Sequence, residues 1–229
     1  MSTLAARWLG RIDYEAALAL QEEIARDHAR SGDVLLLLEH DPVYTIGRGG
    51  RDENLPGSGG RSAPGAPIPV HRIGRGGDVT YHGPGQLVGY PIVDLRARGG
   101  DVHRFLRELE GGLIDVVAEY GVAAGRRAGQ TGVWVGGDAR PRKIASIGIG
   151  VRRGITRHGF ALNVSVELGA FAPIVPCGIA GVEMTSLAAE GVLPVPPVGE
   201  VAAVAARRVA FALGEPAAEA PRAPRDGAR

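Results

Sequence analysis

The chain has 229 residues, of which 45% are hydrophobic and 22% charged, with one cysteine and a formal net charge of +1. This is the composition of an ordinary globular protein with a sizeable core, and no apolar run is long enough to span a membrane. One cysteine cannot form an internal disulfide, and the N-terminus lacks the pattern of a signal peptide, so we expect a cytoplasmic protein.

The first quarter of the chain predicts a helix, a buried strand and a loop. Asp13 can cap a helix that runs to about Arg30 and ends at Gly32. The apolar run 34–39 has the length of a central strand buried on both faces, and a second short strand follows it. The stretch 49–67 is rich in Gly, Ser and Pro and predicts a long, mobile loop.

The stretch 75–86 reads Arg-Gly-Gly-Asp-Val-Thr-Tyr-His-Gly-Pro-Gly-Gln and lies between two β-rich apolar runs, 68–70 and 87–93. Glycine lets backbone approach a ligand closely, and the Gly-Pro-Gly at 83–85 predicts a rigid turn. We interpret 75–86 as a rigid loop that cradles a substrate, with tyrosine and histidine at its bend. A tight connection whose glycines serve packing alone is an equally good interpretation. The stretch is neither a Walker loop nor a dinucleotide fingerprint.

The rest of the chain predicts two helices and several strands. Asp101 can cap a helix whose apolar positions step by three or four residues as far as Tyr120. Strands are expected at 132–135, 143–151 and 155–164, the last two joined by a turn, and a last helix near 198–213. These elements predict an α/β (α+β) fold in which helices flank a mixed sheet. We expect a single catalytic domain over 1–214 and a disordered tail at 215–229.

Positive charge gathers between Val122 and His158. Seven arginines and Lys143 stand against Asp138 alone, a balance of +7 over 37 residues. Such a segment can steer an acidic macromolecule, either a nucleic acid or a protein, or it can simply guard a solvated hairpin edge.

The 26 basic residues include a single lysine, Lys143. Arginine and lysine are exchangeable on a surface but not where a compact amine must lose its proton. Alternation along the strand puts Lys143 on a face with Ala145, Ile147, Ile149 and Val151, where desolvation would favour the neutral amine. We therefore expect a chemical role for Lys143, with a chance lysine as the alternative.

Cys177 lies in a turn between a proline and a glycine, where a thiol can be held at a cleft. A lone cysteine is as often a small buried hydrophobe. A nearby ammonium group favours the thiolate, and a neutral lysine is a general base, so Cys177 and Lys143 could act as a pair. The histidines lack the spacing of a metal site, and we expect His82 and His158 to line the substrate site instead.

Four motifs, in order, resemble those of the lipoyl(octanoyl) transferases: 75–86, Lys143-Ile-Ala-Ser-Ile-Gly148, His158-Gly-Phe-Ala-Leu-Asn-Val164 and Pro176-Cys-Gly-Ile-Ala-Gly181. The resemblance covers about 35–186. It implies the catalytic-domain fold of the biotin and lipoate protein ligases, with no cofactor and no metal. The 49–67 loop, the 136–142 turn and the tail depart from the family pattern.

The resemblance implies transfer of an octanoyl group from octanoyl-acyl carrier protein to a lysine of lipoyl domains, in 2-oxoacid dehydrogenases and the glycine cleavage H protein. Cys177 would form the octanoyl thioester, with Lys143 as acid and base. Backbone N–H groups near Gly178 or in 75–86 would hold the oxyanion, and the basic segment would dock the carrier. The residues lining the acyl and carrier sites would be Arg75, Gly76, Gly77, Asp78, Val79, Thr80, Tyr81, His82, Ser146, Ile147, Gly148, Gly159, Phe160 and Ala161.

Two other functions stay open at this stage. An ATP-dependent lipoate or biotin ligase on the same fold would activate the acid as an adenylate and would need no cysteine. A non-catalytic module could bind nucleic acid through its basic hairpin, although Trp134 is the only aromatic residue near the basic run before Phe160 to stack on a base. We expect neither nucleic acid nor membrane as a partner.

Overall fold

The expected mixed sheet is confirmed in the computed structural model, which describes residues 4–54, 67–179 and 181–214, without the side chains of Asp52 and Cys177. Neighbouring strands of the large sheet are, in spatial order, β1 (Ala5–Ile12), β2 (Val34–His40), β6 (Gln86–Ile92), β10 (Ile155–Asn163), β9 (Arg142–Arg152), β8 (Gln130–Val135) and β7 (Ala124–Arg127). The pairs β1–β2 and β9–β11 (Glu183–Met184) are parallel, and the other pairs of this sheet are antiparallel.

A small sheet of β4 (Val70–Arg72), β3 (Val43–Ile46) and β5 (Val79–His82) lies apart from the large one. The stretch 75–86, which was expected to be a loop, is therefore partly a strand, because β5 occupies its middle. The turn predicted at 83–85 is confirmed: the Gln86 N–H donates to the Gly83 carbonyl at 3.2 Å, and Gly85 has a φ of +83°.

The helices begin where the sequence places their caps. The Asp13 carboxylate accepts from two N–H groups of α1 (Tyr14–Arg26), and the Asp101 carboxylate accepts from the Arg104 N–H of α3 (Val102–Ala118). The predicted first helix is interrupted at Asp27 and resumes as the short α2 (His28–Ser31). The last helix, α4 (Val198–Ala212), lies where it was expected, and 3₁₀ turns form η1 (Asp52–Asn54), η2 (Arg96–Arg98), η3 (Leu168–Phe171) and η4 (Pro176–Gly178).

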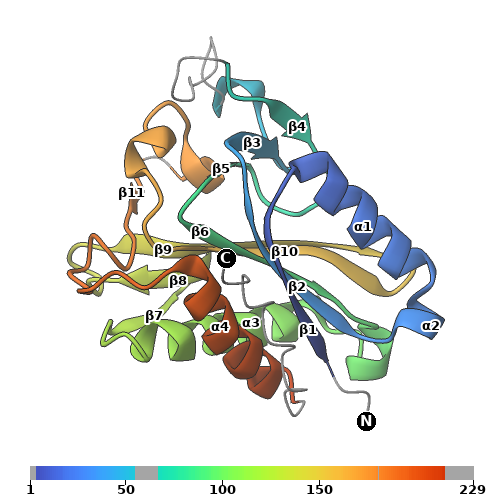
Figure 1. Cartoon of the computed structure of the whole chain (residues 1–229). Helices are drawn as coiled ribbons and strands as arrows, with labels where there is room; N and C mark the ends of the chain where they lie inside the picture. Colours follow the sequence, from blue (N-terminus) through green and yellow to red (C-terminus); the bar gives the residue numbers. More distant parts are fainter. Residues whose placement is uncertain (1–3, 55–66, 180, 215–229) are drawn as a thin grey trace, which may run out of the picture.

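The elements form three layers (Figure 1), with α3 and α4 on one face of the large sheet and α1 and the small sheet on the other. Strand β2 lies in the middle layer, as its apolar run predicts. Leu35 and Leu37 pack in the core shared with α3 and α4, while Leu36 and Leu38 pack in the core shared with α1. Alternate side chains of one strand thus join the two cores.

Besides the two-residue β11, two strands of the large sheet, β1 and β7, were not predicted. Both lie at the ends of the strand order, and their sequences, AARWLGRI and AGRR, contain arginine and glycine instead of an apolar run. An edge strand is paired on one side only and is often charged, so its sequence carries a weak strand signal. Most of the 49–67 loop and the whole 215–229 tail lie outside the described residues. No helix in the described part of the chain is long and apolar enough to cross a bilayer.

Candidate active site

A cavity of about 590 Å³ lies between the β9–β10 pair, the small sheet and α3. All four sequence motifs reach it, the fourth through Ile179. The cavity is lined by most of the expected site residues, namely Arg75, Gly76, Gly77, Asp78, Thr80, His82, Lys143, Ser146, Ile147, Gly148, Gly159, Phe160 and Ala161, and His158 lines it as well.

Val79 and Tyr81 do not line this cavity, which corrects the expectation that the whole of 75–82 faces a ligand. Side chains alternate along β5, so the two residues point into the apolar core of the small sheet. The Tyr81 ring lies 5.5 Å from the rings of both Tyr44 and Phe171. These two positions therefore hold the small sheet together, while their neighbours face the cavity.

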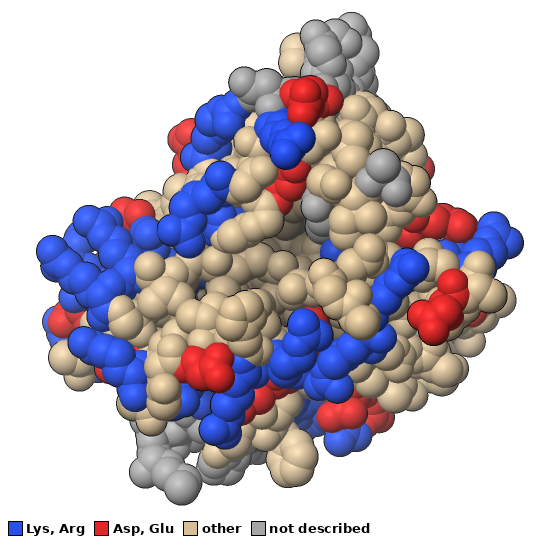
Figure 2. All heavy atoms as spheres, turned by 180° about the vertical axis from the view of Figure 1, so that it is seen from behind, with Lys and Arg blue, Asp and Glu red and all other residues tan. Residues whose placement is uncertain are grey.

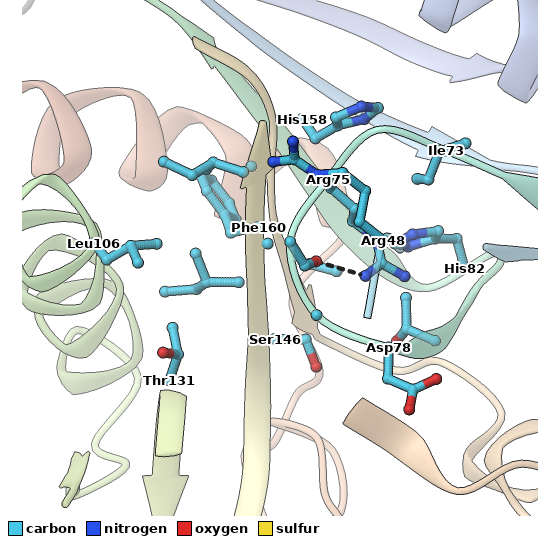
Figure 3. Close-up of a pocket in the computed structure, with 18 of the residues that line it drawn as sticks. Arg48, Ile73, Arg75, Asp78, His82, Leu106, Thr131, Ser146, His158 and Phe160 are labelled. Atoms are coloured by element: carbon cyan, nitrogen blue, oxygen red, sulfur yellow. Dashed lines mark hydrogen bonds between the residues drawn. The ribbon is translucent and has the colours of Figure 1, made fainter. Parts of the chain in front are cut away.

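The cavity has an apolar limb and a polar limb, separated by strand β9 (Figure 3). Leu106, Thr131 and Phe160 lie on the side of β9 that faces α3, whereas Arg75, His82 and Asp78 lie on the opposite side. Several lining residues were not predicted from the sequence: Tyr14, Arg48, Ile73, Tyr90, Val102, Leu106, Gly129, Gln130, Thr131, Ile149 and Ile179. The apolar ones carried no signal, because in sequence they are indistinguishable from core positions.

Glycines let the loop 74–76 lie directly on the strand below it. The Gly76 N–H donates to the Ile149 carbonyl at 2.8 Å. A Cβ atom on Gly148 would lie 2.8 Å from the Gly76 carbonyl oxygen, closer than real Cβ atoms come to backbone. The close approach requires glycine at Gly148 and fixes the 74–76 loop on β9.

A chain of buried hydrogen bonds begins at Arg75, whose guanidinium donates to the Thr45 carbonyl at 2.8 Å and to the Thr45 hydroxyl at 3.0 Å. The Thr45 hydroxyl lies 3.4 Å from His82 Nε2, and His82 Nδ1 lies 2.8 Å from the side-chain carbonyl oxygen of Gln86. A carbonyl oxygen only accepts, so Nδ1 carries the His82 proton and Nε2 is the acceptor.

The same chain continues to the strand that holds Lys143. The Gln86 amide donates to Asn163 Oδ1 at 2.9 Å, and the Asn163 amide donates to the Thr185 carbonyl at 2.8 Å. The Thr185 N–H in turn donates to the Lys143 carbonyl at 3.0 Å. The network thus fixes β5 relative to β9, and Gln86, Asn163 and Thr185 are buried members that the sequence did not single out as site residues.

Two histidines and a tyrosine that line the cavity, His82, His158 and Tyr14, are neutral near pH 7. Burial lowers the pKa of His82 to about 3. Burial, with the nearby charges of Arg157, Arg75 and Arg48, lowers the pKa of His158 to about 4. Burial also raises the pKa of Tyr14 to about 12. The guanidinium groups of Arg48 and Arg75, the latter 8% exposed, lie in the same limb as the Asp78 carboxylate.

Lys143 is 1% exposed, so its predicted burial is confirmed. Its Nζ lies 5.0 Å from the centroid of the Trp134 ring. A Cβ atom on Gly132 would lie 2.6 Å from Lys143 Cε, so the absence of a side chain there makes room for the lysine. The Gly132 N–H donates to the fully buried Glu110 carboxylate at 2.9 Å, and Arg107 pairs with that carboxylate at 2.6 Å. Glu110 on α3 therefore helps to position the Lys143 side chain through Gly132.

Cys177 is the middle residue of η4, and its side chain lies outside the part of the structure that is described. The turn itself abuts the cavity wall. A Cβ atom on Gly178 would lie 2.7 Å from an Asp78 carboxylate oxygen, and Ile179 lines the cavity. Asn54 ties the two segments together, since its amide donates to Asp78 at 2.6 Å and its carbonyl accepts from the Val175 N–H at 3.2 Å. Asn54 was not predicted, because it stands in a stretch whose composition indicates only a loop.

Among the residues that the structure describes, no group of three His, Cys, Asp or Glu side chains is placed to hold a metal ion.

Comparison with known proteins places the chain in a family. The family model for the lipoyl protein ligase A/B catalytic domain matches residues 13–209. An octanoyltransferase from Geobacter metallireducens is 54% identical over 211 residues, which cover 91% of this chain and 93% of that protein. An octanoyltransferase from Mycolicibacterium gilvum is 54% identical over 187 residues, covering 80% of this chain and 75% of that protein.

Solved structures share the fold. A lipoate-protein ligase A bound with ATP superimposes with a TM-score of 0.69 at 15% identity, over 95% of this chain and 88% of that one. A biotin protein ligase from Aquifex aeolicus, in complex with biotin and ATP, gives a TM-score of 0.53 at 12% identity, over 92% and 70%. The fold expected from the resemblance is confirmed, and the chain belongs to the lipoyl protein ligase A/B catalytic domain family and, within it, to the octanoyltransferases.

Proposed function

We propose that this protein transfers an octanoyl group from octanoyl-acyl carrier protein to a lysine of lipoyl domains, in endogenous protein lipoylation. The acceptors are the lipoyl domains of 2-oxoacid dehydrogenases and the glycine cleavage H protein. One observation carries the proposal: the single lysine of the chain is buried in the wall of a cavity that the Pro-Cys-Gly turn abuts at Asp78. The name of two relatives that are 54% identical to this chain over the aligned residues supports it.

In the first step the Cys177 thiolate attacks the carbonyl carbon of the donor thioester. The bond from that carbon to the carrier's sulfur breaks, and the carrier leaves as a thiolate that takes up a proton. In the second step the amine of the acceptor lysine attacks the new thioester, an amide forms, and Cys177 leaves as the thiolate. One thioester replaces another, and the amide forms downhill, so neither step needs ATP. A covalent intermediate lets two protein substrates use one site in turn.

Lys143 is the group that handles the protons. As an ammonium it favours the Cys177 thiolate, and as an amine it accepts the proton that the attacking acceptor lysine loses. Its burial beside Trp134 leaves the amine little access to bulk water, so a proton taken from the acceptor is held on Lys143 until the carrier thiolate released in the next turnover takes it up.

The apolar limb of the cavity suits the octanoyl group of the donor. The apolar limb, with Val102, Leu106, Ile147 and Phe160, takes the octanoyl chain, because apolar surface favours an alkyl group.

The Gly178 N–H already donates to the Val175 carbonyl at 3.0 Å. Of the two sources of oxyanion donors expected from the sequence, the backbone of 75–86 is therefore the one we propose.

We place the reaction in the cytoplasm, because a thiol nucleophile must stay reduced and the chain has no second cysteine with which to form a disulfide.

The test is reconstitution from purified parts. The protein, octanoyl-acyl carrier protein and a lipoyl domain are incubated without ATP, and the lipoyl domain should gain the mass of one octanoyl group. A parallel reaction with free octanoate and ATP tests the ligase alternative. Octanoylation in the second reaction only would assign the chain to ATP-dependent ligation and overturn the proposal.

A further inference from the structure

Another cavity, of about 190 Å³, lies between α1 and the β9–β10 hairpin. It is lined by Arg26, Arg152, Arg153 and Arg157, together with Glu22 and Ala25. We call it the arginine cavity. Arginine presents planar donors that match carboxylate and phosphate groups, so this lining suits an anionic ligand.

The fold holds these side chains together by local means. Arg26 lies in the last turn of α1. Arg152 pairs with Ile155 across a two-residue turn in which Arg153 has a φ of +54° and Gly154 a φ of +84°, and Arg152 and Arg153 are exposed. Arg157 is only 16% exposed and is anchored by the Glu22 carboxylate at 2.6 Å.

The structure distributes the charge of the basic segment unevenly. Arg126 pairs with Glu110, Arg140 with Glu183, and Arg142 with Glu190. These pairs cancel much of the positive charge in the part of the segment near Lys143. At the hairpin end, Arg152, Arg153 and Arg157 of the segment and Arg26 of α1 line the arginine cavity with Glu22 as its one carboxylate, so much of the excess of positive charge that the sequence shows over 122–158 lies there.

The arginine cavity lies at the opposite end of β9 from Lys143. Arg152 lies nine positions after Lys143 on β9, which corresponds to about 30 Å along a strand. The main cavity is lined along β9 from Lys143 to Ile149, and on β10 His158 of the main cavity is next to Arg157 of the arginine cavity. In Figure 2, basic side chains gather at the left, where the end of α1 and the tip of the hairpin lie, and the same face is hollowed near its centre.

We infer that the arginine cavity binds acidic side chains of the carrier protein that donates the octanoyl group, an inference that rests on the proposed function. The distance between Lys143 and the arginine cavity favours the carrier protein, which donates the octanoyl group, over the lipoyl domain, which accepts it. An acceptor offers a lysine on a short stem, so its body must lie at the mouth of the site. A carrier offers its thioester on an extended prosthetic arm, so its body can lie far from Lys143, over the hairpin end.

The experiment compares two double charge reversals of equal net change. One is Arg152→Glu/Arg153→Glu, in the arginine cavity. The control is Arg7→Glu/Arg207→Glu, on the exposed faces of β1 and α4. Steady-state rates are measured with octanoyl carrier protein and with octanoyl-N-acetylcysteamine, a small uncharged thioester. The acylated enzyme is also mixed with a lipoyl domain in a single turnover, which isolates the acceptor step.

We expect the cavity variant to raise KM for the carrier about tenfold at low salt, with kcat little changed, because lost electrostatic complementarity slows encounter. Added salt should raise the wild-type KM towards that of the variant. Rates with the small thioester and in the acceptor step should match those of the wild type, and the control should match throughout.

Three results would overturn the inference: an unchanged KM for the carrier, an equal loss with the small thioester, or a loss confined to the acceptor step. Binding of a short DNA duplex by the wild type but not by the cavity variant, with KM for the carrier unchanged, would assign the cavity to nucleic acid. If the wild type uses neither donor, the proposed function itself fails.

Discussion

On one face of the large sheet, α4 covers β1, β2 and β6 and α3 covers β7, β8 and β9, with apolar side chains such as Leu109, Leu113 and Val209, each fully buried. On the other face, the small sheet lies over strands that present glycine, serine and backbone at the contact. There Gly148 meets the Gly76 carbonyl, and the layers are joined by the hydrogen bonds that start at Arg75.

The difference lies in what each interface leaves unfilled. Over β2 and β6 the apolar interface fills its volume with side chains, and room for a ligand on this face lies beside β9, in the apolar limb. An interface built on glycine and hydrogen bonds fixes two layers at a set distance and leaves space beside them, which is where the polar limb lies. We therefore expect substitutions on the first face to lower stability and substitutions on the second to lower activity.

The largest effect should follow changes at Lys143. Lys143→Arg keeps the charge but does not deprotonate in the working pH range, and Lys143→Met loses the charge as well. Both should lower kcat by at least about a hundredfold, the usual range for a lost acid–base group. Iodoacetamide alkylation of Cys177 separates the two roles, since arginine should keep it fast and methionine should slow it. Transfer by Lys143→Arg at near the wild-type rate would remove the proton-shuttle role.

A core substitution on the helical face should act on stability instead. Leu109→Ala removes a fully buried side chain of α3 and should lower the free energy of unfolding by about 2–5 kcal/mol. Urea unfolding measures this loss. The rate per folded molecule at a temperature well below the transition should stay within about twofold, because Leu109 does not line the cavity. A large fall in that rate would show that the two faces are not separable.

Gly148→Ala tests the other face. The new Cβ would lie 2.8 Å from the Gly76 carbonyl oxygen and push the 74–76 loop away from β9. We expect kcat/KM to fall about thirtyfold, since displacement of a site by about 1 Å can reduce rates a hundredfold. Gly125→Ala on β7 is the matched control, because a Cβ there meets nothing within 4 Å. Equal activity of the two variants would mean that the glycine serves packing alone.

The buried histidines should make stability depend on pH. The pKa values of His40, His82 and His158 are lowered to about 4, 3 and 4, mainly by burial. Each therefore takes up a proton on unfolding below its unfolded pKa of about 6.5. Their contribution to stability is complete above that pH and is lost progressively as the pH falls towards about 4. At pH 5 unfolding should take up about three protons through these groups.

Urea unfolding measured between pH 7 and pH 5 gives the free energy of unfolding at each pH. The slope of that free energy against pH gives the number of protons taken up on unfolding. His40→Gln removes one of the three groups and should reduce the slope by about one proton. A flat profile over this range would show that these histidines are protonated in the folded protein.

Sequence patterns predicted those parts of the molecule in which the preference of the local sequence agrees with the structure that it adopts in the fold. The leucine run at 34–39 forms β2, which is buried on both faces as predicted but lies next to the edge strand instead of at the centre of the sheet, and Asp13 and Asp101 cap their helices. The Arg153-Gly154 turn joins β9 to β10 as expected. Lys143 stood out because the rest of the chain uses arginine, and it is buried as predicted.

The parts that could not be predicted depend on contacts between segments distant in sequence. Asn54 and Asp78, 24 positions apart, meet beside the Cys177 turn. Glu110 looks like any charged position of α3, yet it is fully buried and holds Gly132. Val79 and Tyr81 share a motif with cavity residues, and only the strand that forms there turns them away from the cavity. No sequence pattern marks these positions, because the role of each one is set by the residues that it contacts in the folded chain.

The central claim is that Cys177 carries the octanoyl group between the two protein substrates, and trapping the acylated enzyme tests it most directly. The protein is incubated with octanoyl-acyl carrier protein alone, and its intact mass is measured before and after a lipoyl domain is added. The wild type should gain one octanoyl group, located on Cys177 by peptide mapping, and should lose it to the lipoyl domain, whereas Cys177→Ser should neither gain the mass nor turn over. A wild-type enzyme that octanoylates the lipoyl domain while never carrying the group, or a Cys177→Ser variant that transfers at the wild-type rate, would contradict the claim.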